Sequence, residues 1–251
     1  MPNYNKFKSL LRVLTPPIFV TIFKKVYKQV VHRSFTFKEV DISGKYLYFG
    51  NLSPEEIQFS EVKFVGLALH KIYSRDVVHD AHNRLPCKNN SIEKIQAEDV
   101  FEHLEFERIP AIFDEIHRVL VEGGIFRLSV PDYLAPHNLA DSFFDSDGRI
   151  LGDTASGATI TYDRTLPGRR VLFTEDGGAH LWFPTYELVK ELVNKSEIKS
   201  CSEIIYHQYN VDSEIFVNNQ FPIMGMPVKR VPPLDMRNNG KPVSIVVDFV
   251  K

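Results

Sequence analysis

The sequence predicts an α/β domain built on one mostly parallel sheet. The main observation is the stretch from Arg75 to Tyr133, where short apolar runs alternate with one long helical pattern, the rhythm of βαβ units. Length and composition agree, because 251 residues with 43% hydrophobic content can bury one substantial α/β core and an appended subdomain.

The elements expected up to residue 131 follow from apolar spacing and from turn residues. A helix is expected over Phe106–Leu120, because its apolar residues recur at spacings of three and four. Gly123 and Gly124 are expected to stop that helix, and Pro131 to end the strand that follows. Short apolar runs predict strands at 45–50, 62–70, 76–80, 92–97 and 125–130, with turns at 50–54 and 85–91.

The pattern changes after Tyr133. Residues 134–175 are rich in Gly and Asp and weakly periodic, which is typical of a functional lid or of a partly disordered segment. Three cations in this stretch suit an anionic substrate group, since guanidinium matches such groups bidentately, but a solvated charged loop explains them equally: Arg164, Arg169 and Arg170.

The C-terminal part predicts one helix and two closing strands. Thr185 caps a helix that runs through Val193. Residues 198–209 and 242–250 are expected to form an antiparallel pair at the edge of the sheet, and the proline-containing stretch between them to lie on the substrate side.

Residues 1–40 form an N-terminal extension in which basic and apolar residues interleave, and residues 41–251 form the main domain, with an insertion around 134–180. The apolar run 16–23 is too short to span a bilayer, and no small-residue cleavage site follows it. Two interpretations stay open. The extension is either a helix pair packed on the domain or an amphipathic segment at an anionic membrane surface.

Charge and cysteine content exclude several classes of protein. The net charge of −2 gives no global basic field, so we expect no nucleic-acid partner. Cys87 and Cys201 are too few for a disulfide framework and form no metal-type pair, which favours reduced thiols in the cytoplasm and predicts no metal site.

Several motifs in order resemble a known family. They are the strand ending in Asp80, then Leu85-Pro86, Asn90-Ser91, Glu102-His103-Leu104, Glu115 to Leu120, Gly123-Gly124 and Pro131-Asp132. Together they resemble the second half of class I S-adenosylmethionine-dependent methyltransferases, especially the small enzymes encoded among bacterial surface-polysaccharide genes. The resemblance implies a Rossmann-like sheet with helices on both faces and S-adenosylmethionine as cofactor.

The same resemblance implies where the cofactor binds. Gly50 and Asn51 occupy the glycine-rich loop after the first strand, which is degenerate here because Leu52 stands where a small residue is usual. Ala68 occupies the position of the ribose-binding acid, a contact that His70 or Asn51 could replace. The remaining expected contacts are the adenine-binding Asp80 with Ala81 and His82, and Glu98 at the end of the fourth strand.

Three residues near the mouth of the predicted site are candidates for catalysis. His103 suits general-base chemistry near neutral pH, although a structural histidine holding the loop is the alternative. His180 precedes the helix capped by Thr185, near the substrate entrance of the family, and Asp132 follows the fifth strand. Ligands of open α/β sheets bind at such carboxyl ends.

The function expected from the resemblance is O-methylation of a sugar or a phosphorylated polysaccharide precursor. The partner is then a small molecule or a glycan, and the location cytoplasmic, with peripheral contact at the inner membrane face left open. The alternative is a non-catalytic protein of this fold that binds a partner subunit or a glycan. Leu52 distinguishes them, because a leucine that fills the cofactor space would favour the binding protein.

Overall fold

The computed structural model describes most of the chain beyond residue 45. The chain divides into two compact units, residues 1–40 and 41–251, and the predicted N-terminal extension lies outside the described residues. Arg164 also lies outside them, and so do the side chains of Arg169 and Arg170. The described residues are 46–52, 64–154, 159–162, 169–172, 178–223 and 225–251.

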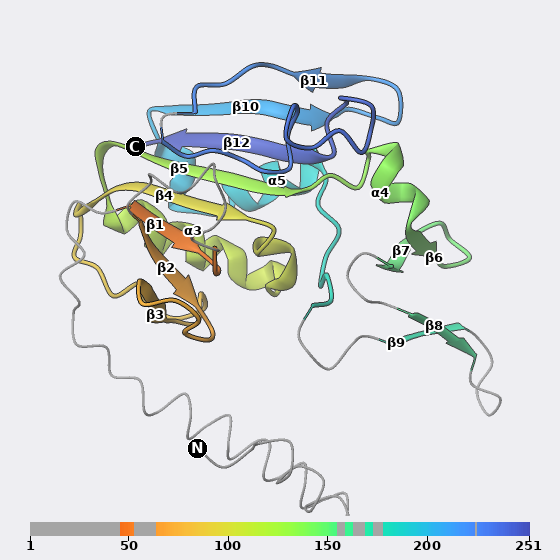
Figure 1. Cartoon of the computed structure of the whole chain (residues 1–251), viewed down its shortest axis with the longest axis horizontal. Helices are drawn as coiled ribbons and strands as arrows, with labels where there is room; N and C mark the ends of the chain where they lie inside the picture. The colour runs from red at the N-terminus through yellow and green to blue at the C-terminus, as the bar shows by residue number, and fades with distance from the viewer. Residues whose placement is uncertain (1–45, 53–63, 155–158, 163–168, 173–177, 224) are drawn as a thin grey trace, which may run out of the picture. The chain divides into compact units, whose positions relative to one another are not determined.

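Eight strands form one sheet in the order β11-β10-β12-β5-β4-β1-β2-β3 (Figure 1). Their bounds are β1 Tyr46–Phe49, β2 Phe64–Ala68, β3 Asp76–Val78, β4 Ile92–Glu98, β5 Leu120–Pro131, β10 Glu203–Asn210, β11 Phe216–Asn218 and β12 Ser244–Val250. Strands β1 to β5 are parallel to one another, whereas β12 runs antiparallel to both β5 and β10, and β11 antiparallel to β10. This topology confirms the predicted Rossmann-like α/β class. It differs from the prediction in one detail, because β12 lies inside the sheet and β11 forms the edge.

The helices α3, Ile109–Val119, and α5, Tyr186–Asn194, pack on one face of the sheet (Figure 1). The apolar residues of α3 join Leu47, Phe49 and Phe126 of the strands in the largest buried cluster. Thr185 caps α5 as predicted, with its hydroxyl accepting a hydrogen bond from the amide of Leu188 at 3.3 Å. Helices are predicted on both faces, and within the described residues the other face is covered by backbone of residues 222–227.

The expectation for Gly123 and Gly124 is wrong. Helix α3 ends at Val119, and Leu120 already pairs with Ile92 as the first residue of β5. Both glycines lie inside β5, where the register shifts, and Gly123 has a φ of +74°. A Cβ on Gly124 would lie 2.8 Å from the carbonyl oxygen of Val121, so the glycines serve a bulge in the strand rather than a helix end.

The second face of the sheet carries a buried polar layer, covered by residues 221–231, which we call the covering segment. Arg127 on β5 is fully buried and donates to the carbonyl oxygens of Pro222 and Met226 at 2.9 and 2.6 Å. Gln96 on β4 donates to the carbonyl of Pro227 at 2.8 Å. The strands thereby fix the covering segment through its backbone, close to the carboxyl end of β4.

Further short elements connect the strands or lie outside the main sheet. Residues 134–175, for which no clear elements are predicted, contain α4 Pro136–Ala140 and two hairpins, β6 Ser142–Phe144 with β7 Ile150–Asp153 and β8 Thr159–Tyr162 with β9 Arg169–Leu172. Three 3-10 turns occur in the described chain, η2 Phe101–His103, η3 Phe106–Arg108 and η4 Glu197–Ser200. The predicted strand 198–209 therefore begins later, at Glu203.

Candidate active site

A cavity of about 390 Å³ opens where β1 and β4 end. Its lining includes three of the predicted cofactor residues, Gly50, Asn51 and Glu98, together with Lys229 and Arg230 of the covering segment. Parallel strands present their carboxyl ends at one edge of the sheet, which is why residues about 50 positions apart meet here. Its volume is within the range of small-molecule sites.

The turn after β1 leaves this cavity open. Gly50 has a φ of +101°, which a residue with a Cβ rarely adopts, and its amide donates to the carbonyl of Leu67 at 2.8 Å. Leu52 borders the cavity but is only 1% exposed, because its side chain packs with Tyr46, Tyr48 and other residues of the second face. Leu52 therefore extends the core instead of filling the predicted cofactor space.

An acid that sequence reasoning missed supports the same turn. Asp76 of β3 is buried and accepts a hydrogen bond from Asn51 Nδ2 at 2.7 Å and from the amide of Tyr73 at 2.7 Å. A Cβ on Gly66 would lie 2.5 Å from Asp76 Oδ1, so the glycine in β2 makes room for this carboxylate. Ala68 provides no acid at the end of β2. Asp76 of β3 instead supplies a carboxylate that is hydrogen-bonded to the loop.

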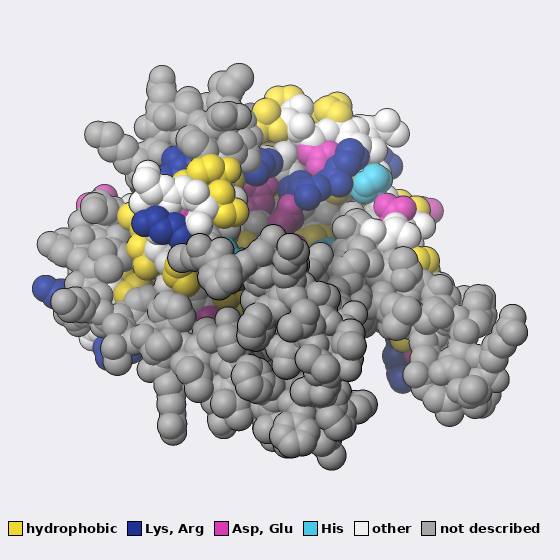
Figure 2. Space-filling model, turned by 60° about the horizontal axis from the view of Figure 1, so that its bottom comes forward, with side chains coloured by type: hydrophobic (Ala, Val, Ile, Leu, Met, Phe, Trp, Pro, Cys, Tyr) yellow, Lys and Arg dark blue, Asp and Glu magenta, His cyan; other side chains and the backbone are white. Residues whose placement is uncertain are grey.

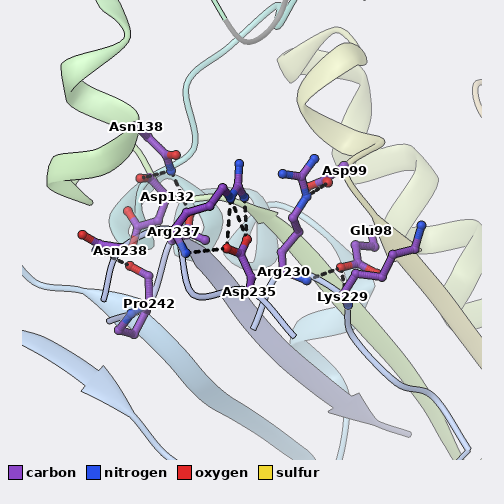
Figure 3. A network of polar contacts seen from close by, with 11 residues as sticks. Glu98, Asp99, Asp132, Asn138, Lys229, Arg230, Asp235, Arg237, Asn238 and Pro242 are labelled. Atoms are coloured by element: carbon purple, nitrogen blue, oxygen red, sulfur yellow. Dashed lines mark hydrogen bonds and ion pairs between the residues drawn. The ribbon is translucent and has the colours of Figure 1, made fainter. Parts of the chain in front are cut away.

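The two carboxylate oxygens of Glu98 differ in their hydrogen bonding. Its Oε1 accepts from the amides of Lys229 and Arg230 at 2.7 and 2.8 Å, whereas Oε2 is buried and accepts no hydrogen bond within the described chain (Figure 3). Burial raises the pKa of Glu98 to about 7, although the two amide hydrogen bonds oppose this shift. Next to it, Asp99 pairs with Arg230, whose Nε lies 2.6 Å from Oδ2.

The other predicted cofactor residues lie further along the same edge of the sheet, outside the lining of this cavity. Ala68 is the last residue of β2, and Asp80, Ala81 and His82 follow β3. Asp80 Oδ1 accepts from the amide of His82 at 3.0 Å and lies 2.9 Å from His82 Nδ1, so this oxygen organises its own turn.

A second cavity of about 190 Å³ adjoins the first, since Asp99 and Arg230 line both. Its lining includes Glu102, His103 and His180, which arrive from η2 and from the residues before α5. The side chains that line this cavity are polar, except for those of Pro131 and Val243. Gly178, which has no side chain, also lies in the lining. Figure 2 shows one face of the molecule, on which Lys and Arg side chains gather next to Asp and Glu side chains and a histidine.

The two histidines face one buried carboxylate. His103 Nε2 and His180 Nε2 lie 3.8 and 3.9 Å from Glu102 Oε1, and Glu102 is fully buried. Burial raises the pKa of Glu102 well above its usual value, and burial lowers the pKa of His103 and so favours its neutral imidazole. The structure thus brings His103 and His180 together, 77 positions apart in the sequence.

Asp132 lies near this cavity but is used inside the fold. It is fully buried, and its carboxylate accepts from the amide of Leu134 at 3.0 Å and from the amide and side chain of Asn210 at 2.6 and 2.9 Å. Both carboxylate oxygens are therefore occupied in joining the end of β5 to the end of β10. These contacts give Asp132 a structural role in the described chain.

Sequence reasoning missed Asp153, Arg230 and Arg237, which line the smaller cavity. Asp153 and Tyr133 contact Nδ1 of His180, and Asp153 comes from β7, in a stretch with no recognisable periodicity. Arg230 and Arg237 come from the proline-containing stretch before β12, and Arg237 forms a bidentate pair with Asp235 (Figure 3). No local pattern marks these side chains, because contacts between distant segments, not periodicity, bring them to the site.

Comparisons with known proteins find a partial match. Residues 34–128 match a family model described as a methyltransferase domain. The matched part of the chain thus resembles a methyltransferase domain, in agreement with the predicted class. No curated protein sequence matches the chain significantly. No helix in the described part of the chain is both long and apolar enough to cross a bilayer.

Solved structures with a similar backbone include three methyltransferases. One is S-adenosylmethionine-dependent and comes from Archaeoglobus fulgidus, with 11% identity, a TM-score of 0.49 and coverage of 94% of this chain and 100% of that one. A possible histamine N-methyltransferase from Thermotoga maritima has 13% identity, a TM-score of 0.47 and coverage of 91% and 96%. The 1,6-didemethyltoxoflavin-N1-methyltransferase of Burkholderia thailandensis, with bound S-adenosylhomocysteine, has 13% identity, a TM-score of 0.38 and coverage of 100% and 91%.

Proposed function

We propose that this protein transfers a methyl group from S-adenosylmethionine to a hydroxyl oxygen of a sugar or a phosphorylated polysaccharide precursor. The observation that carries the proposal is the pair of adjoining cavities that share Asp99 and Arg230. The larger cavity, at the ends of β1 and β4, would hold the cofactor, and the smaller polar cavity would hold the acceptor. When bound, the cofactor supplies an electrophilic methyl group on a positively charged sulfur.

The residues of the larger cavity fit a cationic ligand with a polar end. Glu98 Oε2 is buried without a hydrogen-bond partner in the described chain, and such an oxygen needs a donor or a positive charge. The ammonium and sulfonium groups of the cofactor would supply that charge. Gly50 and Asn51 line the same cavity and would contact the ligand from the turn, and Asp76 holds Asn51 in place.

The composition of the smaller cavity favours a polyhydroxylated acceptor. Most of its lining side chains are polar, and they offer donors, from Arg237, and acceptors, from Asp99 and Asp141. His103 and His180 present Nε2 to the same space, so either imidazole can accept the hydroxyl proton as the oxygen attacks the methyl carbon and the carbon–sulfur bond breaks. Rate enhancement would come chiefly from holding the two reacting atoms in line.

The cellular setting is part of the proposal. In this proposal the enzyme acts in the cytoplasm, and the basic and apolar residues 1–40 would allow peripheral contact with the inner membrane face, where lipid-linked glycans would be assembled.

Calorimetric titration with S-adenosylmethionine and S-adenosylhomocysteine tests the cofactor site. We expect Glu98→Gln to weaken binding of S-adenosylmethionine roughly 10- to 100-fold, the effect of losing one charge-assisted contact. Glu93→Gln, an exposed carboxylate on the same strand, is the matched control and should bind like the unmodified protein. Asp80→Ala tests the adenine contact in the same assay.

The outcomes of this titration separate the alternatives. Binding followed by transfer of labelled methyl to a nucleotide sugar or an oligosaccharide supports the proposal. Equal binding by Glu98→Gln would place the cofactor elsewhere. No binding of either ligand at millimolar concentration would reject the proposal, and pull-down of a partner subunit or a glycan would then identify a non-catalytic role.

A further inference from the structure

We propose that Glu102, His103 and His180 form a binding site for one divalent transition-metal ion. The first observation is the state of Glu102, whose side chain is 0% exposed and whose two carboxylate oxygens accept no hydrogen bond from any other described residue. A buried carboxylate without a partner is costly, and proteins keep such groups where a cation or a metal ion pairs with them. No described arginine or lysine forms an ion pair with this carboxylate.

The spacing of the three side chains suits an ion and does not suit direct hydrogen bonds. His103 Nε2 and His180 Nε2 lie 3.8 and 3.9 Å from Glu102 Oε1, beyond hydrogen-bond distance. One ligand atom from each residue lies within 4.8 Å of the other two. Three ligands at metal distances of about 2.0–2.2 Å in tetrahedral directions are roughly 3.4 Å apart. The two distances from Glu102 Oε1 to the histidine nitrogens would therefore shorten by about 0.5 Å around an ion, and no distance in the set by more than about 1.4 Å.

The opposite nitrogen of each histidine is already engaged, which directs Nε2 toward Glu102. His103 Nδ1 lies 3.0 Å from the carbonyl oxygen of Ala179, an acceptor that requires Nδ1 to carry the proton. His180 Nδ1 lies 3.0 Å from Asp153 Oδ2 and contacts the hydroxyl of Tyr133. Carbonyl and carboxylate acceptors on Nδ1 are the usual support of metal-binding histidines, because they leave the Nε2 lone pair for the ion.

Backbone contacts hold the two parts of the site together. The amide of Leu181 donates to the carbonyl of Glu102 at 2.8 Å, and Trp182 Nε1 donates to the carbonyl of Phe101 at 2.9 Å. The rings of His103 and His180 meet edge to face with centroids 4.9 Å apart. The segment that carries His180 is therefore docked on η2, so the cluster is a built feature of the fold rather than a chance approach of exposed side chains.

Two imidazoles and one carboxylate favour zinc, iron, cobalt or manganese over magnesium or calcium, which prefer oxygen ligands. Three protein ligands leave a coordination position open toward the smaller cavity. If the proposed methyl transfer is correct, this position would hold the acceptor hydroxyl and lower its pKa, and its proton would leave to solvent because both Nε2 lone pairs coordinate the ion. Binding of the ion itself does not depend on that use.

The test measures metal binding by the full chain without cofactor or acceptor. After treatment with a chelator, the protein is titrated with Co²⁺ and Zn²⁺, and bound metal is measured by visible absorption and by elemental analysis. We expect one ion per chain and at least about a 10-fold weaker affinity in each of Glu102→Gln, His103→Ala and His180→Ala. His117→Ala, on the exposed side of α3, is the control and should bind like the unmodified protein.

A thermal assay guards against variants that fail to fold. Zn²⁺ should raise the melting temperature of the unmodified chain and not that of Glu102→Gln, whereas the metal-free Glu102→Gln should melt no lower than the metal-free parent, because the carboxyl group that it replaces accepts no hydrogen bond in the described chain. Stoichiometric binding that survives Glu102→Gln and both histidine variants, or no binding at millimolar Co²⁺ and Zn²⁺, would overturn the proposal. Either result leaves the S-adenosylmethionine titration to judge the methyltransferase proposal separately.

Discussion

Replacing Asp248 by asparagine should be among the most destabilising single changes in the described sheet. Asp248 on β12 receives two hydrogen bonds of 2.7 Å from Arg127, from Nε and from Nη2, and lies 2.9 Å from His207 Nε2. The side chain of Arg127 is 0% exposed and that of Asp248 is 5% exposed. Asp248→Asn therefore leaves a buried guanidinium without its counter-charge.

Removing one partner of such a buried pair costs about 3–5 kcal/mol of the free energy of unfolding. For a chain of this length, that corresponds to a fall in melting temperature of roughly 6–20 °C. Urea denaturation followed by circular dichroism measures the free energy, and Glu203→Gln, an exposed carboxylate on β10, should change it by less than about 0.5 kcal/mol.

A double-mutant cycle sharpens this prediction. Combining Asp248→Asn with Arg127→Met removes the unpaired charge, so the combined loss should be smaller than the sum of the two single losses by about 1–3 kcal/mol. Arg127 also binds the carbonyls of the covering segment, so the single variant Arg127→Met should weaken S-adenosylmethionine binding as well. A loss below about 1 kcal/mol for Asp248→Asn, or strict additivity, would refute the reasoning.

The acid dependence of stability and the packing of β2 provide two further predictions. Burial opposes ionisation of Asp248, but its hydrogen bonds with Arg127 and His207 outweigh burial and hold its pKa below the usual value. A carboxylate whose pKa is lower in the folded state than in the unfolded state stabilises the fold fully above about pH 4–5, and this stability is lost as the pH falls through the folded-state pKa. The unmodified chain should therefore lose more of its free energy of unfolding between about pH 5 and 2 than Asp248→Asn does. Gly66→Ala should cost roughly 1–3 kcal/mol in urea denaturation, because its Cβ would lie 2.5 Å from Asp76 Oδ1, and an unchanged midpoint would show that Asp76 can move aside freely.

Local patterns in the sequence determined the class of the fold and most of its elements. Apolar spacing over residues 109–119 marks α3, Thr185 marks the start of α5, and short apolar runs mark the parallel strands. These signals are reliable because they arise from burial of one face and from capping, which involve neighbours in the chain. The same reasoning is wrong for Gly123 and Gly124, since a bulge in a strand and the end of a helix both favour glycine.

The site was predictable only in part, and for a physical reason. Gly50, Asn51, Glu98 and His103 follow strand ends, and strand ends of a parallel sheet converge at one edge. Only the tertiary structure shows that Leu52 packs into the core, that Asp132 accepts hydrogen bonds from Asn210, and that Arg230 lines both cavities. Only the tertiary structure also places His180 beside both Glu102 and Asp153. Such contacts depend on how distant segments, such as the residues before α5, dock on the sheet, and no local pattern encodes that docking.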